Sequence, residues 1–214
     1  FLFSNFKNED FTTLLNFLEN WFIRRHITDY PATNKLDQIF IDLISEIYKI
    51  GYSFENIELF LKNKDNYQGD EKFGERLIND DLYDINIGAT RCLLTKLEKS
   101  KRTKKSKINF WETTGDKKQK LIWSIEHIMP QNPDKKTDWL LIDEEIRKQY
   151  IHKIGNLTLT CYNSNLSNKS FIDKILIKEN EKDIGLKSGN VKINEYLMSK
   201  NEWTIEDIKN RSEL

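Results

Sequence analysis

The hydrophobic period of this 214-residue chain changes once, near Gly115. Before that point apolar residues recur every three or four positions, most regularly over residues 36–48, as on the inner face of an amphipathic helix. After it, polar and apolar residues alternate over residues 121–129 until Pro130, which is typical of a strand. The sequence therefore predicts a helical N-terminal region followed by a smaller domain that contains strands.

Residues that start or end helices divide the N-terminal region. Pro31 breaks a first helix, and Gly51 is expected just past the end of a second. Ser53 and Asp70 can each cap a further helix. A last helix is expected over about residues 84–98. Three leucines are predicted to face inward from it: Leu93, Leu94 and Leu97. We predict a helical bundle over residues 1–107.

The second region, residues 108–214, predicts the order strand, long connection, strand and helix. The connection is expected to hold a helix over residues 143–153, closed by Gly155, and the second strand covers residues 156–160. A helix follows a turn at residues 163–165. Its expected inner face consists of Phe171, Ile172, Ile175 and Leu176. Four tryptophans are assigned to core packing: Trp111, Trp123, Trp139 and Trp203.

The charges of the chain cancel, since 34 basic and 34 acidic side chains give a formal net charge of zero. A globally basic DNA-binding protein is therefore excluded, and only a local cluster of cations could form such a surface. The segment from Lys99 to Lys107 is such a cluster, with six cations in nine positions. It is either a solvated linker or an arm that contacts phosphate. The second interpretation makes candidates of Lys101, Arg102, Lys104 and Lys105.

Cysteine use and hydropathy indicate the compartment. Cys92 and Cys161 are far apart, so we expect neither a disulfide framework nor a structural zinc site. No apolar stretch approaches the length that spans a bilayer, and there is no signal peptide. A cytoplasmic protein without a membrane partner is expected. The absence of an initiator methionine suggests a piece of a longer polypeptide, although a processed terminus would look the same.

Three short segments carry the residues suited to chemistry: IEHIMPQN (125–132), GNLTLT (155–160) and YNSNLSNKSFIDK (162–174). Hydrolysis of a phosphodiester needs a base that activates water and a positive charge where negative charge develops. His127 ends the predicted strand beside Glu126, so the two side chains can serve a water and a metal. Asn165, at the start of the next helix, can complete an oxygen-rich Mg²⁺ site.

These segments resemble the HNH (His-Me finger, ββα-metal) nuclease domain, through E-H-I-x-P, G-N-L-T-L and N-x-S-N-x-x-F-x-x-K. More narrowly, the chain resembles the C-terminal nuclease domain of the GmrSD-type, modification-dependent restriction endonucleases. The likeness extends upstream through FLENWFIRRHI and PATNKLDQIF. It implies a mainly α protein, with a helical region and a small ββα-metal domain with helical additions. It also implies cleavage of double-stranded DNA in bacterial or archaeal defence, and an N-terminal nucleotide-dependent domain in complete members.

The resemblance also assigns roles. Glu126 and Asn165 would bind one divalent metal, Mg²⁺ or Mn²⁺, His127 would be the base, and Asn156 would brace the loop. Two features depart from the common HNH pattern. The last ligand is Asn instead of His, which favours Mg²⁺ over zinc, and the connection from His127 to Asn156 is 29 residues (156 − 127). The long connection is a feature of the GmrSD-type members.

Several assignments leave alternatives open. Asn163 and Asn168 compete with Asn165 for the ligand role, with Asn168 second in order. Asn168, Lys169 and Lys174 are also candidates for contacts to nucleic acid, although single lysines on helices are usually only solvated. His152 is interpreted as structural, near a helix end, and His26 as part of a cation cluster with internal ion pairs. The alternative function is a catalytically inactive module that binds nucleic acid or a partner in a restriction complex, and RNA is not excluded as a substrate.

Overall fold

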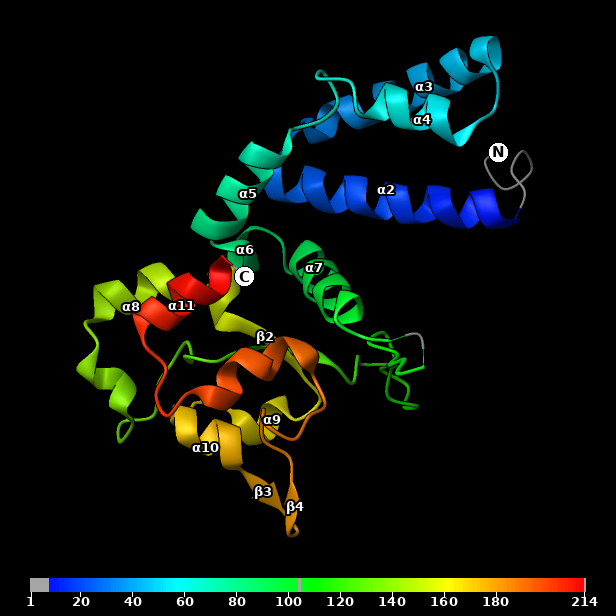
Figure 1. Cartoon of the computed structure of the whole chain (residues 1–214). Coiled ribbons are helices and arrows are strands. Elements are labelled where there is room, and N and C mark those ends of the chain that lie inside the picture. The colour runs from blue at the N-terminus through cyan, green and yellow to red at the C-terminus, as the bar shows by residue number, and fades with distance from the viewer. Residues whose placement is uncertain (1–7, 104, 214) are drawn as a thin grey trace. The chain divides into compact units, whose positions relative to one another are not determined.

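The computed structural model describes residues 8–103 and 105–213, and the chain divides into two compact units, Phe1–Arg76 and Leu77–Leu214 (Figure 1). Helix α5 (Asp70–Asn79) carries the chain from one unit into the other. The sequence suggested a boundary after residue 107, where the composition changes. The described part of the charged segment that follows α7 lies instead within the second unit.

The first unit consists of α2 (Asn8–Thr28), η1 (Thr33–Lys35), α3 (Leu36–Ile50), α4 (Phe54–Leu61) and the start of α5. Each long helix buries one face, because its apolar residues recur with the helical period. Trp21 lies in the middle of this core, and its indole nitrogen donates to the carbonyl of Leu61 at 3.0 Å. The buried cluster contains Leu14, Trp21, Ile39, Leu43, Ile47, Ile57 and Leu61.

The predicted helix boundaries of the first unit are largely confirmed. Helix α3 ends before Gly51, which has a φ of +104°, and the hydroxyl of Ser53 accepts from the backbone of Asn56 at the start of α4. Asp70 lies in the first turn of α5. The Arg24–Arg25 pair makes internal ion pairs, as expected, because Arg24 binds Asp70 at 2.5 Å and Arg25 lies 3.5 Å from Asp29.

The helix expected over residues 84–98 is two helices, α6 (Leu82–Ile85) and α7 (Ile87–Ser100). Asn86 separates them because its extended backbone and its side chain cap α7 through the amide of Ala89. Leu93 and Leu94 are buried as predicted, whereas Leu97 is 40% exposed, so its predicted orientation is wrong. The buried stripe of α7 continues to Glu98 instead, where the carboxylate binds Arg102.

The second unit contains the predicted order of strand, long connection, strand and helix. Strand β1 (Ser124–His127) pairs antiparallel with β2 (Leu157–Thr160), with Ser124 opposite Thr160 and His127 opposite Leu157. The alternating segment is only partly in this ladder, since its start is bridged to Thr113 through Leu121. Helices α9 (Asn163–Leu166) and α10 (Phe171–Leu176) follow β2.

Short elements complete the unit. The connection between the strands contains η2 (Asp138–Leu141), α8 (Glu144–Tyr150) and η3 (Ile154–Asn156). After α10 come a two-stranded hairpin of β3 (Lys178–Glu179) and β4 (Lys182–Asp183), then η4 (Lys192–Ser199) and α11 (Ile205–Ser212). Figure 1 shows the hairpin extending from the part of the unit that holds α9 and α10. Among the described helices, none combines the length and apolarity needed to cross a membrane.

One hydrophobic core joins these elements. Its buried members are Ile128, Met129, Trp139, Ile151, Leu166, Phe171, Ile175, Leu186, Leu197, Trp203 and Ile208. The predicted inner face of α10 is half correct: Phe171 and Ile175 are buried, whereas Ile172 and Leu176 are exposed. A helix this short buries one narrow face, and Lys174 takes the remaining place on it. The core assignment of Trp111 is wrong because it is 43% exposed.

Helix α11 packs directly against the turn that precedes β2. A Cβ atom added to Gly155 would lie 1.9 Å from the carbonyl oxygen of Ile208. The guanidinium of Arg211 donates to the carbonyl oxygens of Gly155 at 2.7 Å and Leu157 at 2.8 Å. Glycine is therefore required here for close approach of two backbones, and α11 fixes the segment that carries Asn156.

Gly155→Ala is expected to lower the free energy of unfolding of the second unit by about 1–3 kcal/mol, because the added methyl group displaces α11. Chemical denaturation followed by tryptophan fluorescence measures this, since Trp203 is buried beside α11. Gly115→Ala is the matched control, with no atom within 4 Å of the added Cβ. Equal stability of the two variants would contradict the close packing inferred at Gly155.

Candidate active site

His127 lies at the end of β1 and is buried, with 7% of its surface exposed. Its Nε2 atom is 3.1 Å from Nδ1 of His152, and its Nδ1 atom is 3.3 Å from the amide nitrogen of Gln131. The edge of the ring meets the ring of Tyr83 at 4.5 Å between centroids. Both ring nitrogens therefore have polar partners, which hold the imidazole in one orientation.

The surroundings of His127 keep its imidazole neutral. Burial, followed by the nearby charges of His152 and Lys174, lowers the pKa of His127 to about 3. The ring is therefore unprotonated at neutral pH, which a proton acceptor requires.

Asn156 fixes the loop that follows β1. Its side-chain oxygen accepts from the backbone N–H of Met129 at 2.8 Å, and its amide nitrogen donates to the carbonyl of Met129 at 2.9 Å. The same amide donates to Ile151, and the indole of Trp203 donates to the Asn156 oxygen at 3.3 Å. All of this is buried, so Asn156 braces the backbone beside His127 and is itself removed from solvent.

Glu126 is held by a buried lysine. The ammonium group of Lys174 lies 2.5 Å from a carboxylate oxygen of Glu126 and donates to the carbonyl of His127 at 2.6 Å. Both side chains are buried, Lys174 completely. Burial raises the pKa of the Glu126 carboxyl and lowers the pKa of the Lys174 ammonium, while their mutual attraction opposes both shifts. Lys174 therefore ties α10 to the end of β1.

A cavity of about 360 Å³ opens beside these residues. It is lined by Tyr83, Ile125, Glu126, His127, Pro130, Gln131, Asn132, Asn163, Ser167, Asn168 and Lys174. Its potential ligands are carboxylate, amide and hydroxyl oxygens, without a thiol. Such donors fit a hard cation such as Mg²⁺, which keeps several waters and takes few protein ligands. Because Lys174 binds one oxygen of Glu126, the second oxygen is the one left for a metal.

The structure separates the three asparagines that compete for the ligand role. Asn163 and Asn168 line the cavity with Glu126. The side chain of Asn165 instead donates to Glu179 of the β3–β4 hairpin at 3.2 Å. This arrangement favours Asn168, the second choice from the sequence, or Asn163 over Asn165.

The residues that the sequence suggested for phosphate contacts differ in their burial and in their partners. Lys174 is fully buried, so it offers no surface to a phosphate in this structure, and Lys169 donates to the carbonyl of Asn165 at 2.7 Å. Arg102 is committed to buried Glu98 at 2.5 Å and to the carbonyl of Asn190. Lys101 and Lys105 are exposed. Lys104, also named from the sequence, lies outside the described residues.

Sequence reasoning missed His152 as a member of the site. Its ring stacks on Tyr83, with centroids 5.4 Å apart and planes at 8°, and it contacts His127. Its Nε2 atom lies 3.5 Å from a carboxylate oxygen of Asp84. The only sequence signal was its position three residues before Gly155, close to the bracing Asn156. Spacing alone could not show that α6 approaches this point.

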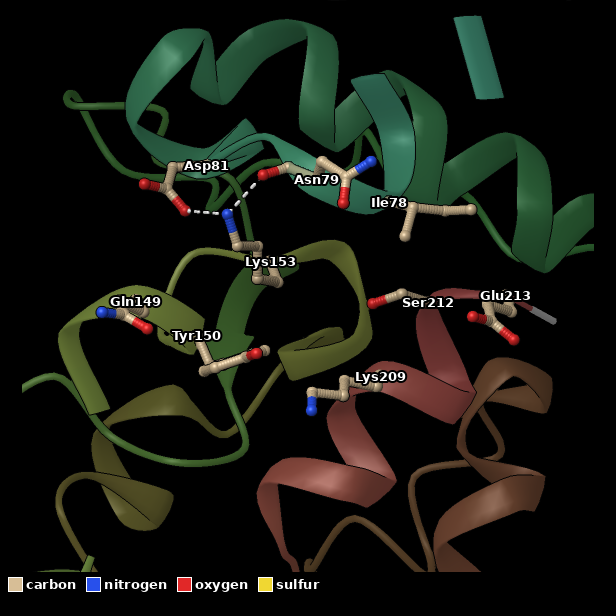
Figure 2. A pocket seen from close by; sticks show the side chains of 9 residues that line it. All are labelled: Ile78, Asn79, Asp81, Gln149, Tyr150, Lys153, Lys209, Ser212 and Glu213. Atoms are coloured by element: carbon tan, nitrogen blue, oxygen red, sulfur yellow. Dashed lines mark hydrogen bonds and ion pairs between the residues drawn. The ribbon is translucent and has the colours of Figure 1, made fainter. Parts of the chain in front are cut away.

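A second cavity, of about 490 Å³, lies where α8 and α11 face the end of α5. Figure 2 shows Lys153 reaching from this cavity wall to the carbonyl of Asn79, at 2.5 Å, and to Asp81, at 2.9 Å. These contacts anchor the segment that leads into α6. The cavity holds none of the residues that the sequence singled out for chemistry.

A neutral histidine beside a carboxylate, over a cavity lined by oxygen donors, is an arrangement suited to hydrolysis assisted by a cation. The family described as GmrSD restriction endonucleases, C-terminal domain, matches residues 67–214, and the chain belongs to this family. The match includes the whole second unit. No curated protein matches the chain.

The Glu126–Lys174 pair generates a stability prediction. Lys174→Met is expected to lower the free energy of unfolding by about 3–5 kcal/mol, because it leaves a buried carboxylate without its partner. Adding Glu126→Gln should recover part of that loss, so the double variant costs less than the sum of the single ones. Denaturation of the four proteins in EDTA measures the cycle.

Lys148→Met is the matched control, since Lys148 makes an exposed ion pair on α8. Its loss should change the free energy of unfolding far less than Lys174→Met does, because solvent screens an exposed ion pair. A strictly additive cycle at Glu126 and Lys174 would contradict the coupling inferred from the structure.

Proposed function

We propose that this chain is an HNH-type endonuclease that hydrolyses DNA phosphodiester bonds with one divalent metal, in defence against foreign or modified DNA. The single observation that carries the proposal is the placement of His127 and Glu126 at one strand end, over an oxygen-lined cavity. Membership in a restriction endonuclease family supports DNA as the substrate.

In this proposal His127 accepts the proton of the attacking water. Its low pKa keeps it neutral beforehand, and Asn156 holds the backbone from which it projects. Glu126, with Asn168 or Asn163, would hold the metal. When bound, Mg²⁺ or Mn²⁺ would supply positive charge to the phosphate oxygens and the leaving 3′-oxygen. Lys174 orients Glu126 and partly offsets its charge.

The affinity for DNA is proposed to come from exposed cations outside the cavity, since the cavity itself holds a single, buried lysine. Lys101 and Lys105 are exposed and follow α7. Such contacts supply affinity that does not depend on sequence and that weakens with salt. Binding and chemistry would therefore be separable by mutation.

A second candidate function is a binding module without catalysis. The ion pair between Lys174 and Glu126 favours it, because the carboxylate that a metal would need is already engaged by a cation. The two functions differ in whether the chain cuts DNA or only binds it.

Plasmid cleavage distinguishes them. The chain is expected to cut supercoiled DNA with Mg²⁺ or Mn²⁺ and not with EDTA. His127→Ala should reduce the rate by at least about 100-fold, because the general base is lost, while DNA affinity in a gel-shift assay stays unchanged. Gel electrophoresis of the products gives the rate.

Lys148→Met is again the control and should cut like the wild type, since Lys148 lies on the surface of α8. Cleavage by His127→Ala at the wild-type rate would contradict the assigned base. Equal loss of binding and cleavage would contradict their separation, and DNA binding without cleavage by the wild type would favour the binding module.

A further inference from the structure

A series of contacts connects His127, at the end of β1, with His152, which follows α8, and His152 with Asp84 on α6. His127 Nε2 lies 3.1 Å from His152 Nδ1, and His152 Nε2 lies 3.5 Å from an oxygen of Asp84. Tyr83 covers both imidazoles, stacked on His152 and edge-on to His127. The two imidazoles are therefore held against one aromatic ring.

Helix α6 is anchored at its N-terminal end. The hydroxyl of Thr90 donates to the carbonyl of Leu82 at 2.7 Å within the buried part of the unit. Lys153, the residue after His152, binds Asn79 and Asp81 just before α6 (Figure 2). The start of the helix that carries Asp84 is therefore held by two contacts, one of them from the residue next to His152.

Hydrogen-bond chemistry then selects the protonated nitrogens. The carboxylate of Asp84 lies 3.5 Å from Nε2 of His152, and its negative charge favours the proton of a neutral His152 on that nitrogen. The Nδ1 atom of His152 is then an acceptor, and His127 must donate to it from Nε2. The lone pair of His127 consequently lies on Nδ1.

The other side of the ring requires the same arrangement. The amide nitrogen of Gln131 carries only hydrogens to donate, and it lies 3.3 Å from Nδ1 of His127. An unprotonated Nδ1 satisfies this contact. Two partners on opposite sides of the imidazole therefore agree on one tautomer.

We propose that His152 is a positioning residue that accepts the Nε2–H of His127 and so places the imidazole lone pair on Nδ1, which can take a proton when the Gln131 amide moves away. The tautomer itself does not depend on nuclease activity, whereas its use as a base rests on the proposed function. His152 would act through His127 without touching the substrate.

Nitrogen-15 NMR of the histidine side chains in the full chain tests the tautomer. In the wild type, at a pH where the imidazoles are neutral, His127 should be protonated at Nε2 and not at Nδ1. His152→Phe should weaken this preference, because only Gln131 then supports it, and His152→Gln, whose amide oxygen still accepts, should restore it. His26→Gln is the matched control and should leave the signals of His127 unchanged.

A wild-type His127 protonated at Nδ1 would overturn the proposal without any variant. An unchanged tautomer in a folded His152→Phe would overturn it too. Where the wild type cuts DNA, His152→Phe should lower kcat by about 10- to 100-fold with little change in KM, and His152→Gln should recover most of it. A wild type that never cuts counts against the proposed function alone, because the NMR result still decides the role of His152.

Discussion

Asn156 makes two buried hydrogen bonds to the backbone of Met129, one to its N–H and one to its carbonyl, and much of the second unit is arranged around that contact. It joins the segment before β2 to the loop after β1, across the long connection between the strands. Buried backbone groups must be paired, so the loop can take few other paths. Helix α11 secures the same segment from behind through Gly155 and Arg211. His127 and Glu126 thus project from a rigid strand end.

Lys174 gives this strand end its electrostatic character. A fully buried ammonium compensates the charge of Glu126, binds the carbonyl of His127 and helps to keep the imidazole neutral. The sequence suggested that Lys174 contacts phosphate, whereas in the structure it forms an internal ion pair with Glu126. Glu126 would therefore attract a metal less strongly than an unpaired carboxylate, so the amide oxygens that line the cavity would contribute more to binding it. We propose a site suited to a weakly held, well-hydrated cation.

The sequence predicted what periodicity and local chemistry determine. Helix α3, the cap at Ser53 and the two strands follow from patterns within a few residues of one another. The bracing role of Asn156 was implied by the family resemblance, and its contact with Met129 spans the long connection. Orientation in short elements was less predictable. Leu97 and Ile172 are apolar residues on helices, yet they are exposed, because Glu98 and Lys174 take the buried faces. Glu98 accepts from the distant backbone amides of Lys192 and Ile193, and Lys174 pairs with the distant Glu126.

The candidate site shows the same limit. Spacing could place Asn165 on the helix after β2, but it could not show that the hairpin of β3 and β4 would draw this side chain to Glu179. Likewise, the sequence around His152 does not indicate that Tyr83 and Asp84 lie beside it. Contacts between elements that are far apart in the chain decided these cases.

A metal site built on Glu126 underlies the proposed function, and calorimetric titration with Mn²⁺ measures it. The wild type should bind one ion and Glu126→Gln none. Glu179→Gln, which removes the same charge beside Asn165, should bind Mn²⁺ like the wild type. Unchanged binding by Glu126→Gln, or loss of binding in Glu179→Gln alone, would contradict a metal site built on Glu126.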